Sequence, residues 1–393
     1  MVKKNRDLVV SCEQGSHLVR LRGGRHFFKS AKCPGCGASV DPRRWRRLAR
    51  FSENLSQPAS KHPIDRVVWA ATVGMFLITI LLVGVFRATA DLWWPATVVL
   101  FGPRWITLPP VAGLLALALL RDRSLLVPLV FSSALLIGPV IGFGWGLRAL
   151  TLSERDSDLT VVTLNVAGGH MIEYGPDVLM DRLGADLMMV QECGGSFQES
   201  ILRLRDWYSA TEASLCAISR FPISKVAVMD RENLQSVGGS ALVATFSIMV
   251  TEHPIYVTNV HLETPRAGLE RILRGRVSEG AEILGQKSLL REIELRRTER
   301  FAREQGSPAL IVGDFNTPPE SRHFRKIYAD WTDAFQSAGF GIGGTRLNGW
   351  IRARIDYVLA NDDWVIVRAT PGTPVGSDHL PVIARLRLKM PRG

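Results

Sequence analysis

Six short motifs in the C-terminal half of the chain end apolar runs with side chains that can bind a metal ion or move a proton. They are TLNVAGG with Asn165, VQECGG with Glu192, NVHLETP with His261, GDFN with Asp314 and Asn316, RIDYVLA with Asp356, and GSDHLPV with Asp378 and His379. Residues two positions apart in a strand face the same way, so Asp314 and Asn316 are expected on one face. Carboxylate and amide oxygens suit a hard divalent cation, and a histidine near a carboxylate suits proton transfer. The set therefore indicates metal-assisted chemistry at a phosphate ester.

Each of these residues also has an ordinary structural interpretation. An Asp or Asn at the end of a strand often caps a turn, and a single His is more often packed than catalytic. Six such positions, all at strand ends in one segment, are hard to explain as separate caps. The pattern therefore favours one shared site.

The segment that must position these side chains has the pattern of a globular unit. From residue 159 on, short apolar runs rich in β-branched residues recur, and most lack a charge until their final positions. Such runs are typical of strands buried between two layers. Helical stretches intervene, the longest over 266–305 with Arg, Glu and Leu at a spacing of three to four. This alternation predicts an α+β or α/β sandwich.

Taken in order, the motifs LNV, QE, VHLE, GDFN, RIDY and SDHLP resemble those of the endonuclease/exonuclease/phosphatase superfamily. That group includes pancreatic-type deoxyribonucleases, abasic-site endonucleases, neutral sphingomyelinases and inositol-polyphosphate 5-phosphatases. The resemblance covers a catalytic domain over about residues 159–388. It implies an α/β four-layered sandwich of two packed sheets flanked by helices, with the site where strand ends of both sheets converge.

The resemblance also implies how a metal ion and the attacking water are held. Glu192 resembles the main Mg²⁺ or Mn²⁺ ligand, with Asn165 and Asp378 close to the same ion. Asp314 resembles the group that positions or deprotonates the water. Asn316 resembles a donor to the phosphate oxygens.

The same resemblance assigns the remaining polar residues. His379 resembles the imidazole beside the scissile phosphate, and Asp356 the carboxylate that orients it. His261 stands where deoxyribonuclease-like and sphingomyelinase-like relatives keep a second histidine that protonates the leaving oxygen. Arg220, in ISRFPI, matches an SR-aromatic-P turn and is predicted to bind phosphate, with a structural ion pair as the alternative.

Residues 67–147 are predicted to form about three transmembrane helices. The three are 67–86, 105–120 and 124–147. The first has twenty positions without a charge, about the length that spans a ~30 Å hydrocarbon core. Pro109 and Pro110 are expected to shorten or kink the second. A buried helical core in a soluble protein is the alternative.

Cations beside the spans predict the orientation in the membrane. RRWRRLAR at 43–50 precedes the first span, and the RDR loop at 121–123 shares its side if there are three spans. We therefore expect a multi-pass protein of a bacterial inner or plasma membrane, with a cytoplasmic N-terminus and residues 148–393 on the outer side. Two or four spans would place that half in the cytoplasm.

The net charge of +11 is unevenly distributed along the chain. Residues 1–66 hold 15 Lys and Arg against 5 Asp and Glu, whereas residues 148–393 hold 29 against 30. The basic character belongs to the N-terminal segment, so charge alone gives no reason to place nucleic acid on the C-terminal half.

The cysteines fall into two groups. An N-terminal zinc-ribbon-like module is predicted over 1–42, before a basic linker over 43–66, because KCPGCG has the form of a zinc knuckle. The proposed structural Zn²⁺ ligands are Cys12, His17, Cys33 and Cys36, with His26 as the alternative to His17; a metal-free ribbon also fits. Cys193 and Cys216 could pair in an oxidising compartment, but buried free thiols are the default.

The motifs indicate a phosphoester hydrolase but not its substrate. Tethering at a bilayer favours a phosphodiester in a phospholipid or sphingolipid headgroup. The sequence shows no aromatic-tipped hairpin of the kind that secreted sphingomyelinases insert into membranes. A tethered nuclease acting on DNA or RNA is one alternative, and a catalytically silent binding module is another.

Overall fold

The computed structural model describes residues 63–389 except 231, 236, 237, 251, 253, 349 and 350, together with the backbone of four short N-terminal strands. The strands are β1 (Leu8–Ser11), β2 (Leu18–Leu21), β3 (Ala31–Lys32) and β4 (Ser39–Val40), paired antiparallel as β1–β2 and β3–β4. The predicted zinc ligands Cys12, His17, Cys33 and Cys36 lie outside the described residues. The contacts divide the chain into two compact units, Met1–Phe76 with Pro110–Phe131 and Leu77–Pro109 with Ser132–Gly393.

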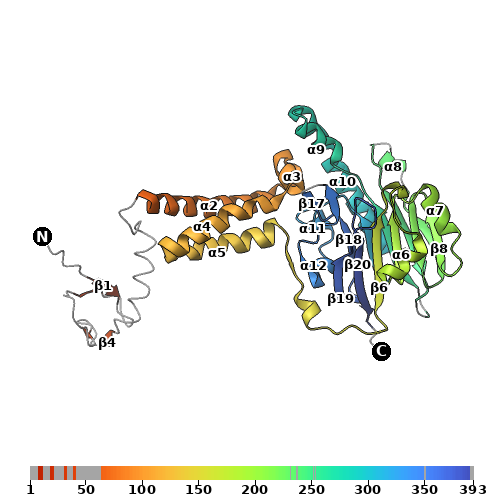
Figure 1. The fold of residues 1–393 in the computed structure, drawn as a ribbon, viewed down its shortest axis with the longest axis horizontal. Helices are drawn as coiled ribbons and strands as arrows, with labels where there is room; N and C mark the ends of the chain where they lie inside the picture. Colours follow the sequence, from red (N-terminus) through yellow and green to blue (C-terminus); the bar gives the residue numbers. More distant parts are fainter. Residues whose placement is uncertain are drawn as a thin grey trace. The chain divides into compact units, whose positions relative to one another are not determined.

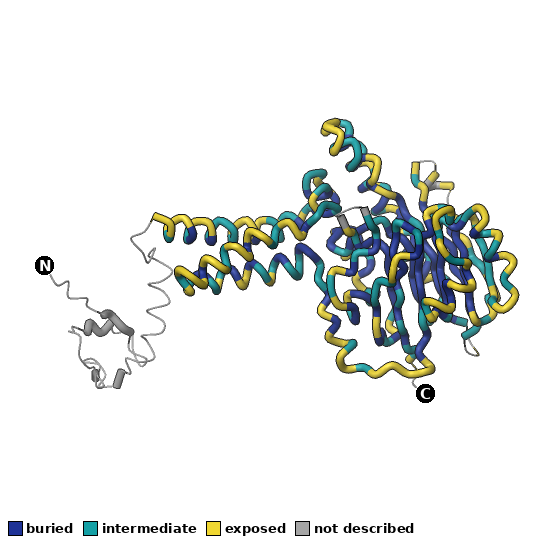
Figure 2. Tube along the Cα trace, in the orientation of Figure 1, coloured by how far each residue is buried: buried dark blue, intermediate teal, exposed yellow. Residues whose placement is uncertain are grey.

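Three helical stretches are long and apolar enough to cross a membrane, judged by length and composition. They are Pro63–Ala88 (α2), Arg104–Arg121 and Arg123–Val140. The second stretch consists of a 3₁₀ turn (Arg104–Thr107) followed by α4 (Leu108–Arg121). The third consists of a 3₁₀ turn (Arg123–Leu125), α5 (Leu126–Leu135) and a π turn (Leu136–Val140). Only 17%, 17% and 28% of their most apolar windows are buried, so among the described residues they do not form a buried soluble core (Figure 2). Most of the apolar surface of these helices is therefore exposed in the described part of the chain.

Two details of these helices differ from the prediction. Pro109 and Pro110 lie in the first turn of α4, where a missing N–H removes no helical hydrogen bond, so neither kinks the helix interior. The third stretch ends at Val140 rather than at 147. Beyond it the chain forms β5 (Gly144–Trp145) and a 3₁₀ turn (Leu147–Leu150).

Two six-stranded sheets form the globular part of the chain (Figure 1). In spatial order, the first contains β10 (Ile223–Val228), β11 (Leu242–Ile248), β12 (Ile255–His261), β13 (Ala309–Asp314), β18 (Asp356–Ala360) and β14 (Thr332–Asp333); the second contains β19 (Trp364–Pro371), β20 (Val382–Leu388), β6 (Leu159–Asn165), β7 (Leu187–Gln191), β9 (Leu215–Ser219) and β8 (Tyr208–Glu212). Within these sheets β12 pairs parallel with β13, and β6 with β7. Other neighbouring strands pair antiparallel.

Apolar side chains fill the space between the sheets and both outer faces. The inner cluster joins Met189 of the second sheet to Phe246 and Val312 of the first. Helices cover the outer faces: α6 (Pro176–Leu183) and α7 (Gly195–Leu202) on the second sheet, and α10 (Val277–Gln305) and α11 (Arg322–Ile327) on the first. The central strands β6, β7, β9, β13 and β18 are buried on both faces, which explains their nearly uncharged sequences, whereas the edge strands β8 and β10 are partly exposed (Figure 2). The predicted four-layered α/β sandwich is confirmed.

Smaller elements complete the domain. They are a 3₁₀ turn (Ala167–Gly169), α8 (Glu232–Gln235), α9 (Arg266–Leu273), α12 (Ala334–Ala338), β15 (Phe340–Gly341), β16 (Arg346–Asn348) and β17 (Ile351–Ala353). The long helix predicted over 266–305 is in fact two helices, α9 and α10. Gly275 separates them with a φ of +80°, a left-handed conformation that glycine adopts without a steric penalty.

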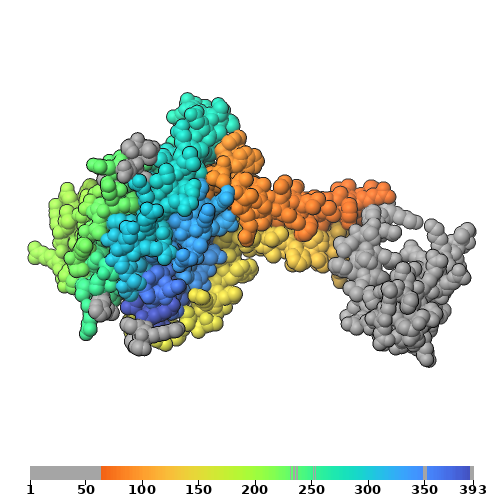
Figure 3. Space-filling view, turned by 180° about the vertical axis from the view of Figure 1, so that it is seen from behind, coloured from red at the N-terminus to blue at the C-terminus, as the bar shows by residue number. Residues whose placement is uncertain are grey.

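The segment between the first two apolar helices packs on the globular domain. It contains a 3₁₀ turn (Ala90–Leu92) and α3 (Trp94–Phe101), which lies against α10 (Figure 3). Buried Asp91 accepts hydrogen bonds through Oδ2 from Ser321 Oγ at 2.6 Å and from His323 N at 3.2 Å. Nη1 of Arg104 lies 2.6 Å from Glu320 Oε2. These partners follow GDFN in the chain, so the segment supports the loop that leaves β13.

Cys193 and Cys216 form a disulfide with their Cα atoms 6.0 Å apart. The default expectation of free thiols is therefore wrong. The bond joins the residue after Glu192 to β9, so it holds the turn that carries Glu192 against the sheet.

Removing this disulfide is expected to destabilise the chain. Replacing both cysteines by serine frees a loop of about 23 residues in the unfolded state and should lower the free energy of unfolding by about 3 kcal/mol. Chemical denaturation of the full chain in detergent, with and without dithiothreitol, measures this. Dithiothreitol should destabilise the wild-type chain and leave the double variant unchanged; equal stability of the reduced and oxidised wild type would contradict the prediction.

Candidate active site

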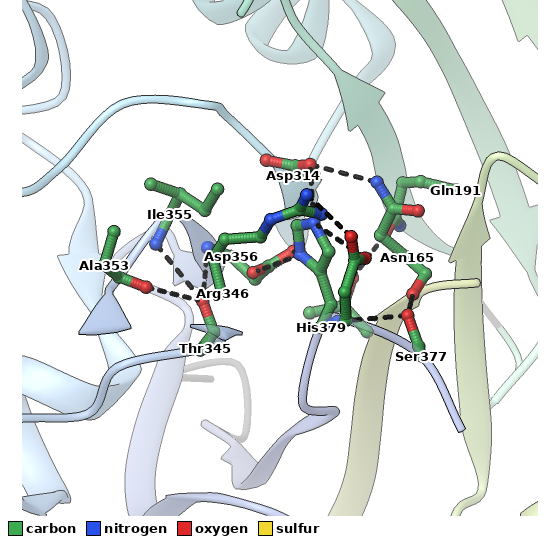
Figure 4. A network of polar contacts seen from close by, with 12 residues as sticks. Asn165, Gln191, Asp314, Thr345, Arg346, Ala353, Ile355, Asp356, Ser377 and His379 are labelled. Atoms are coloured by element: carbon green, nitrogen blue, oxygen red, sulfur yellow. Dashed lines mark hydrogen bonds and ion pairs between the residues drawn. The ribbon is translucent and has the colours of Figure 1, made fainter. Parts of the chain in front are cut away.

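The topology of the two sheets brings the predicted polar residues to one edge (Figure 4). Asn165 ends β6 and Glu192 follows β7, while His261 ends β12 and Asp314 ends the parallel strand β13. Asp356 begins β18, which runs antiparallel to β13 and pairs it directly with Asp314. The carboxyl ends of parallel strands meet at one edge, so both sheets deliver side chains there.

A buried histidine lies between two buried carboxylates at the centre of this edge. Nδ1 of His379 lies 2.9 Å from Asp356 Oδ2, and Nε2 lies 3.8 Å from Asp314 Oδ2. Only 2% of the His379 side chain is exposed. Asp356 therefore fixes the orientation of the ring, and the opposite nitrogen faces Asp314.

The surroundings shift the proton affinities of this trio. Burial lowers the pKa of His379, but the Asp356 and Asp314 carboxylates outweigh burial and raise the pKa to about 9. Burial also raises the pKa of Asp314, and repulsion from the Asp356 carboxylate raises it further. The attraction of His379 and His261 lowers it, but the net shift is upward. The result is an imidazolium at neutral pH beside an unusually basic aspartate.

Asn165 holds two carboxylates in place. Its Nδ2 donates to Glu192 Oε1 and to Asp314 Oδ2, both at 3.0 Å, while its Oδ1 accepts from Ala167 N at 2.9 Å. Asn165 therefore positions both carboxylates through its amide nitrogen. Its role as a metal ligand stays a prediction, because an amide oxygen that accepts one backbone hydrogen bond keeps a second lone pair.

Glu192 and Asp378 offer carboxylate oxygens that fit a hard cation. The Glu192 side chain is 42% exposed. Asp378 Oδ1 is buried and has no hydrogen-bond partner among the described residues. The pKa of Arg266 is raised mainly by Glu270, and the carboxylates of Asp378 and Glu192 raise it further. Asp378 and Glu192 therefore both lie close enough to interact electrostatically with the Arg266 guanidinium. Oxygen donors of this kind suit Mg²⁺ or Mn²⁺.

A second group of possible ligands lies deeper in the site. Asp314, Asp356 and His379 each offer one ligand atom, and these atoms lie within 4.8 Å of one another. A cation there would have to displace the His379 proton, which the two carboxylates stabilise. The more exposed pair of Glu192 and Asp378 is therefore the better fit.

Residues 162–379, more than half of the 393-residue chain, match the sequence profile of the Endonuclease/Exonuclease/phosphatase family. The chain belongs to this family. Its members are phosphoester hydrolases that use a divalent metal ion, so the chain is a hydrolase of the Endonuclease/Exonuclease/phosphatase type.

Several solved structures are similar to the chain at low sequence identity. D. rerio TDP2 complexed with single-strand DNA product shares 14% identity at a TM-score of 0.45, over 59% of this chain and 100% of that one. A mannosyl-6-phosphatase of Bacteroides thetaiotaomicron VPI-5482 shares 14% at 0.41, over 58% and 100%. A functionally unknown conserved protein from Enterococcus faecalis V583 shares 16% at 0.39, over 59% and 100%. Comparison with curated proteins gives no match.

Two other residues predicted from the family resemblance face the same edge. Nε2 of His261 lies 3.5 Å from Glu192 Oε1 and 4.0 Å from Asp314 Oδ2. Asn316 lies beside Asp314, to which its backbone N–H donates at 2.8 Å, but its Nδ2 donates to Leu262 O at 2.9 Å. Asn316 therefore ties the ends of β12 and β13 together in addition to any contact with phosphate.

Arg220 does not lie at the family site. It follows β9, which is antiparallel to β7, and its Nε lies 3.5 Å from Oδ1 of Asp186, the residue before β7. Glu192 follows the other end of β7. The structural ion pair named as the alternative is therefore what the structure contains at Arg220.

Three residues of the site were missed in the sequence. Arg346 Nη2 lies 2.6 Å from Asp378 Oδ2. Ser377 Oγ donates to Asn165 O at 2.6 Å and accepts from His379 N, while Thr345 Oγ1 accepts from Asp356 N at 3.2 Å. All three lie in irregular segments or a short strand, so only the serine next to the SDH motif carried a local signal.

Glu192 and Asn316 adopt backbone conformations that cost energy. Their φ angles are +50° and +47°, in the left-handed region that residues other than glycine seldom occupy. Such conformations persist where the surrounding structure determines them, and they concentrate at functional sites. The hydrogen bonds of Asn165 to Glu192 and of Asn316 to Leu262 provide that support.

The stability of the fold should depend on the protonation of His379. Its folded-state pKa of about 9 exceeds the ordinary value of about 6.5, so it stabilises the fold fully below pH 6.5 and loses this contribution as pH rises through 9. The loss should be on the order of 3 kcal/mol in the free energy of unfolding. Denaturation of the full chain with EDTA at pH 6.5 and 9.5 measures it.

The matched control for this titration is the Asp356→Asn variant, which removes the main source of the raised pKa. Its stability should change much less across the same pH interval. An equally steep decrease in the variant would mean that other groups cause the pH dependence.

Proposed function

We propose that the chain is a membrane-anchored, divalent-metal-dependent phosphodiesterase in which a water molecule attacks phosphorus in line with the leaving oxygen. The observation that carries this proposal is the His379 imidazole held between buried Asp356 and Asp314, 4.0 Å from an Asp378 oxygen, Oδ1, that has no hydrogen-bond partner among the described residues. A catalytically silent domain would have no need to keep such a costly arrangement of buried charges.

Glu192 and Asp378 would hold a Mg²⁺ or Mn²⁺ ion. When bound, the ion supplies positive charge to the phosphate oxygens and helps to orient the ester. Asn165 keeps Glu192 in position by donating to Oε1, and it leaves the second oxygen of that carboxylate free.

The remaining side chains act on protons and developing charge. Asp314, whose pKa burial raises, positions the water and accepts its proton. His379, kept cationic by Asp356, stabilises the charge that grows on a phosphoryl oxygen. His261, 3.5 Å from Glu192, protonates the leaving oxygen. Arg346 is close enough to Asp378 to contact a phosphate at the same edge.

The membrane anchor is supported by the three apolar stretches and their low burial. Three spans, together with the cations at 43–50 and 121–123, support a cytoplasmic N-terminus and a hydrolase domain on the outer side. The Cys193–Cys216 disulfide agrees with that side, because disulfides persist in oxidising compartments. The proposal also includes a zinc-ribbon-like module formed by residues 1–42 on the cytoplasmic side of the membrane.

Variants of the proposed machinery test the reaction. Glu192→Ala, Asp314→Asn and His379→Ala should each lower kcat for bis-p-nitrophenyl phosphate by about 10²- to 10⁴-fold, because each removes an interaction made in the transition state. EDTA should abolish turnover and Mg²⁺ or Mn²⁺ should restore it. The purified full chain in detergent is the material for this assay.

The matched control is Glu199→Ala, which removes an exposed carboxylate paired only with Arg203 on the surface of α7. It should retain wild-type turnover. Near-normal kcat in one of the three site variants would remove that residue from the mechanism, and metal-independent turnover would overturn the proposed ion site.

Fusions at the C-terminus test the proposed orientation in a bacterial host. Alkaline phosphatase fused after Gly393 should be active, and green fluorescent protein fused there should stay dark, since the first folds only outside the cytoplasm and the second only within it. The reverse pattern would place the hydrolase domain in the cytoplasm and indicate an even number of spans.

A further inference from the structure

A cavity of about 600 Å³ lies beside the proposed active site and is not used by the mechanism above. One wall contains Leu380, which directly follows His379 in the chain. Leu380 N donates to Thr345 O at 2.7 Å, and the Thr345 hydroxyl accepts from Asp356 N. The cavity and the His379–Asp356 pair therefore share one stretch of backbone.

Other lining residues come from the ends of two apolar stretches. Arg104 and Trp105 line the cavity and begin the second candidate span. Ile141 also lines it and directly follows Val140, the last residue of the third. If these stretches cross a bilayer, the cavity lies where they leave the hydrocarbon, which is the level of the lipid headgroups.

The lining combines apolar surface with cationic groups. Trp105, Ile141 and Ile342 supply apolar area. Arg352 supplies an exposed guanidinium, and the buried Arg104 guanidinium is already paired with Glu320. A molecule that matches both kinds of surface is an amphiphile with an anionic head.

Three aromatic side chains form a cluster within a few positions of the cavity-lining residues Ile141 and Ile342 in the chain. The Phe143 ring lies 4.9 Å from the Trp145 ring and 5.2 Å from the Phe340 ring. Trp145 and Phe340 are 56% and 74% exposed, although they pair as strands β5 and β15. Exposed aromatic residues a few positions beyond an apolar span are typical of the membrane interface.

The sequence shows no aromatic-tipped hairpin, but this aromatic cluster could contact a membrane in the same way. Its members come from two segments that are far apart in the chain and meet only through the β5–β15 pair. In each segment a residue two positions from an aromatic residue of the cluster lines the cavity, namely Ile141 and Ile342. The cluster thus extends the cavity toward a lipid surface.

We infer that this cavity is a lipid subsite, which holds an anionic phospholipid of the surrounding bilayer so that its phosphodiester reaches the site at His379. The inference rests on the proposed phosphodiesterase function and specifies its substrate class. In the reaction one water adds to phosphorus, one P–O ester bond breaks and the leaving oxygen takes a proton. The products are a phosphomonoester and an alcohol, and no other reactant is needed.

The test uses the full chain in vesicles of phosphatidylcholine and phosphatidylglycerol with Mn²⁺. Ile342→Trp fills the cavity and Arg352→Glu reverses its exposed charge. Each should lower the rate of phosphatidylglycerol hydrolysis about tenfold, equivalent to about 1.4 kcal/mol in binding, while hydrolysis of soluble bis-p-nitrophenyl phosphate stays within about twofold of wild type. The matched controls Val228→Trp and Arg203→Glu alter exposed positions away from the cavity and should change neither rate.

Photo-crosslinking provides a readout that does not depend on turnover. A diazirine-labelled phosphatidylglycerol should attach to peptides containing Trp105 or Ile342 in the wild-type chain and in Glu192→Ala. This labelling should fall in Arg352→Glu but not in Arg203→Glu. Labelling spread over the apolar helices, with none at the cavity, would overturn the lipid subsite.

The two readouts separate this inference from the function on which it rests. Metal-dependent hydrolysis of the soluble reporter without lipid hydrolysis or cavity labelling overturns the lipid subsite alone. Cavity labelling in a chain that hydrolyses neither compound overturns the phosphodiesterase and retains the subsite. Equal losses on both substrates in Ile342→Trp and Arg352→Glu would show that the cavity supports the site structurally and holds no lipid.

Discussion

The electrostatic balance among Asp314, His379 and Asp356 is the interaction on which the rest of the site depends. Asp314 and Asp356 are directly opposite each other on neighbouring strands, and two like charges in that position repel. The imidazolium of His379 offsets the repulsion, and it comes from the loop before β20 in the other sheet. Removing His379 would leave two buried carboxylates facing each other without a cation, so the imidazolium helps to hold the two sheets together at this edge.

Hydrogen bonds around the trio make its geometry specific. Thr345 and Ser377 bond the backbone beside Asp356 and His379, and Asn165 joins the second sheet to Asp314 in the first. A network in which each buried polar group has a partner holds side chains more firmly than separate pairs do. The less buried carboxylates of Glu192 and Asp378 lie beside this rigid centre, where a ligand from solvent can reach them.

Much of the fold and of the site could be predicted because buried strands carry a simple signal. An uncharged run that ends in Asn, Glu, His or Asp gives both the strand and the edge at which its polar residue appears, as for Asn165 and Asp314. The position of Arg220 could not be predicted, because sequence alone does not give strand direction. Antiparallel β9 carries Arg220 to the end of the sheet opposite Glu192.

Other features depended on contacts between distant segments, which no local pattern reports. Arg346 and Thr345 lie in short or irregular segments whose positions follow from tertiary packing. The disulfide depended on β7 and β9 being neighbours. The third apolar stretch continues in sequence beyond Val140, yet the chain leaves the helix there because Gly144 and Trp145 pair with β15.

The hydrogen bonds of Asp91 show that the hydrolase domain includes residues from the segment between the first two apolar helices. Its buried carboxylate lies in the segment between the first two apolar helices and accepts hydrogen bonds from Ser321 and His323, at the start of α11. A fragment that begins at residue 151 would expose these groups and the surface under α3 to water. The hydrolase domain is therefore completed by the segment between the first two apolar helices, and a fragment without that segment would lose part of its packing and of its buried hydrogen bonds.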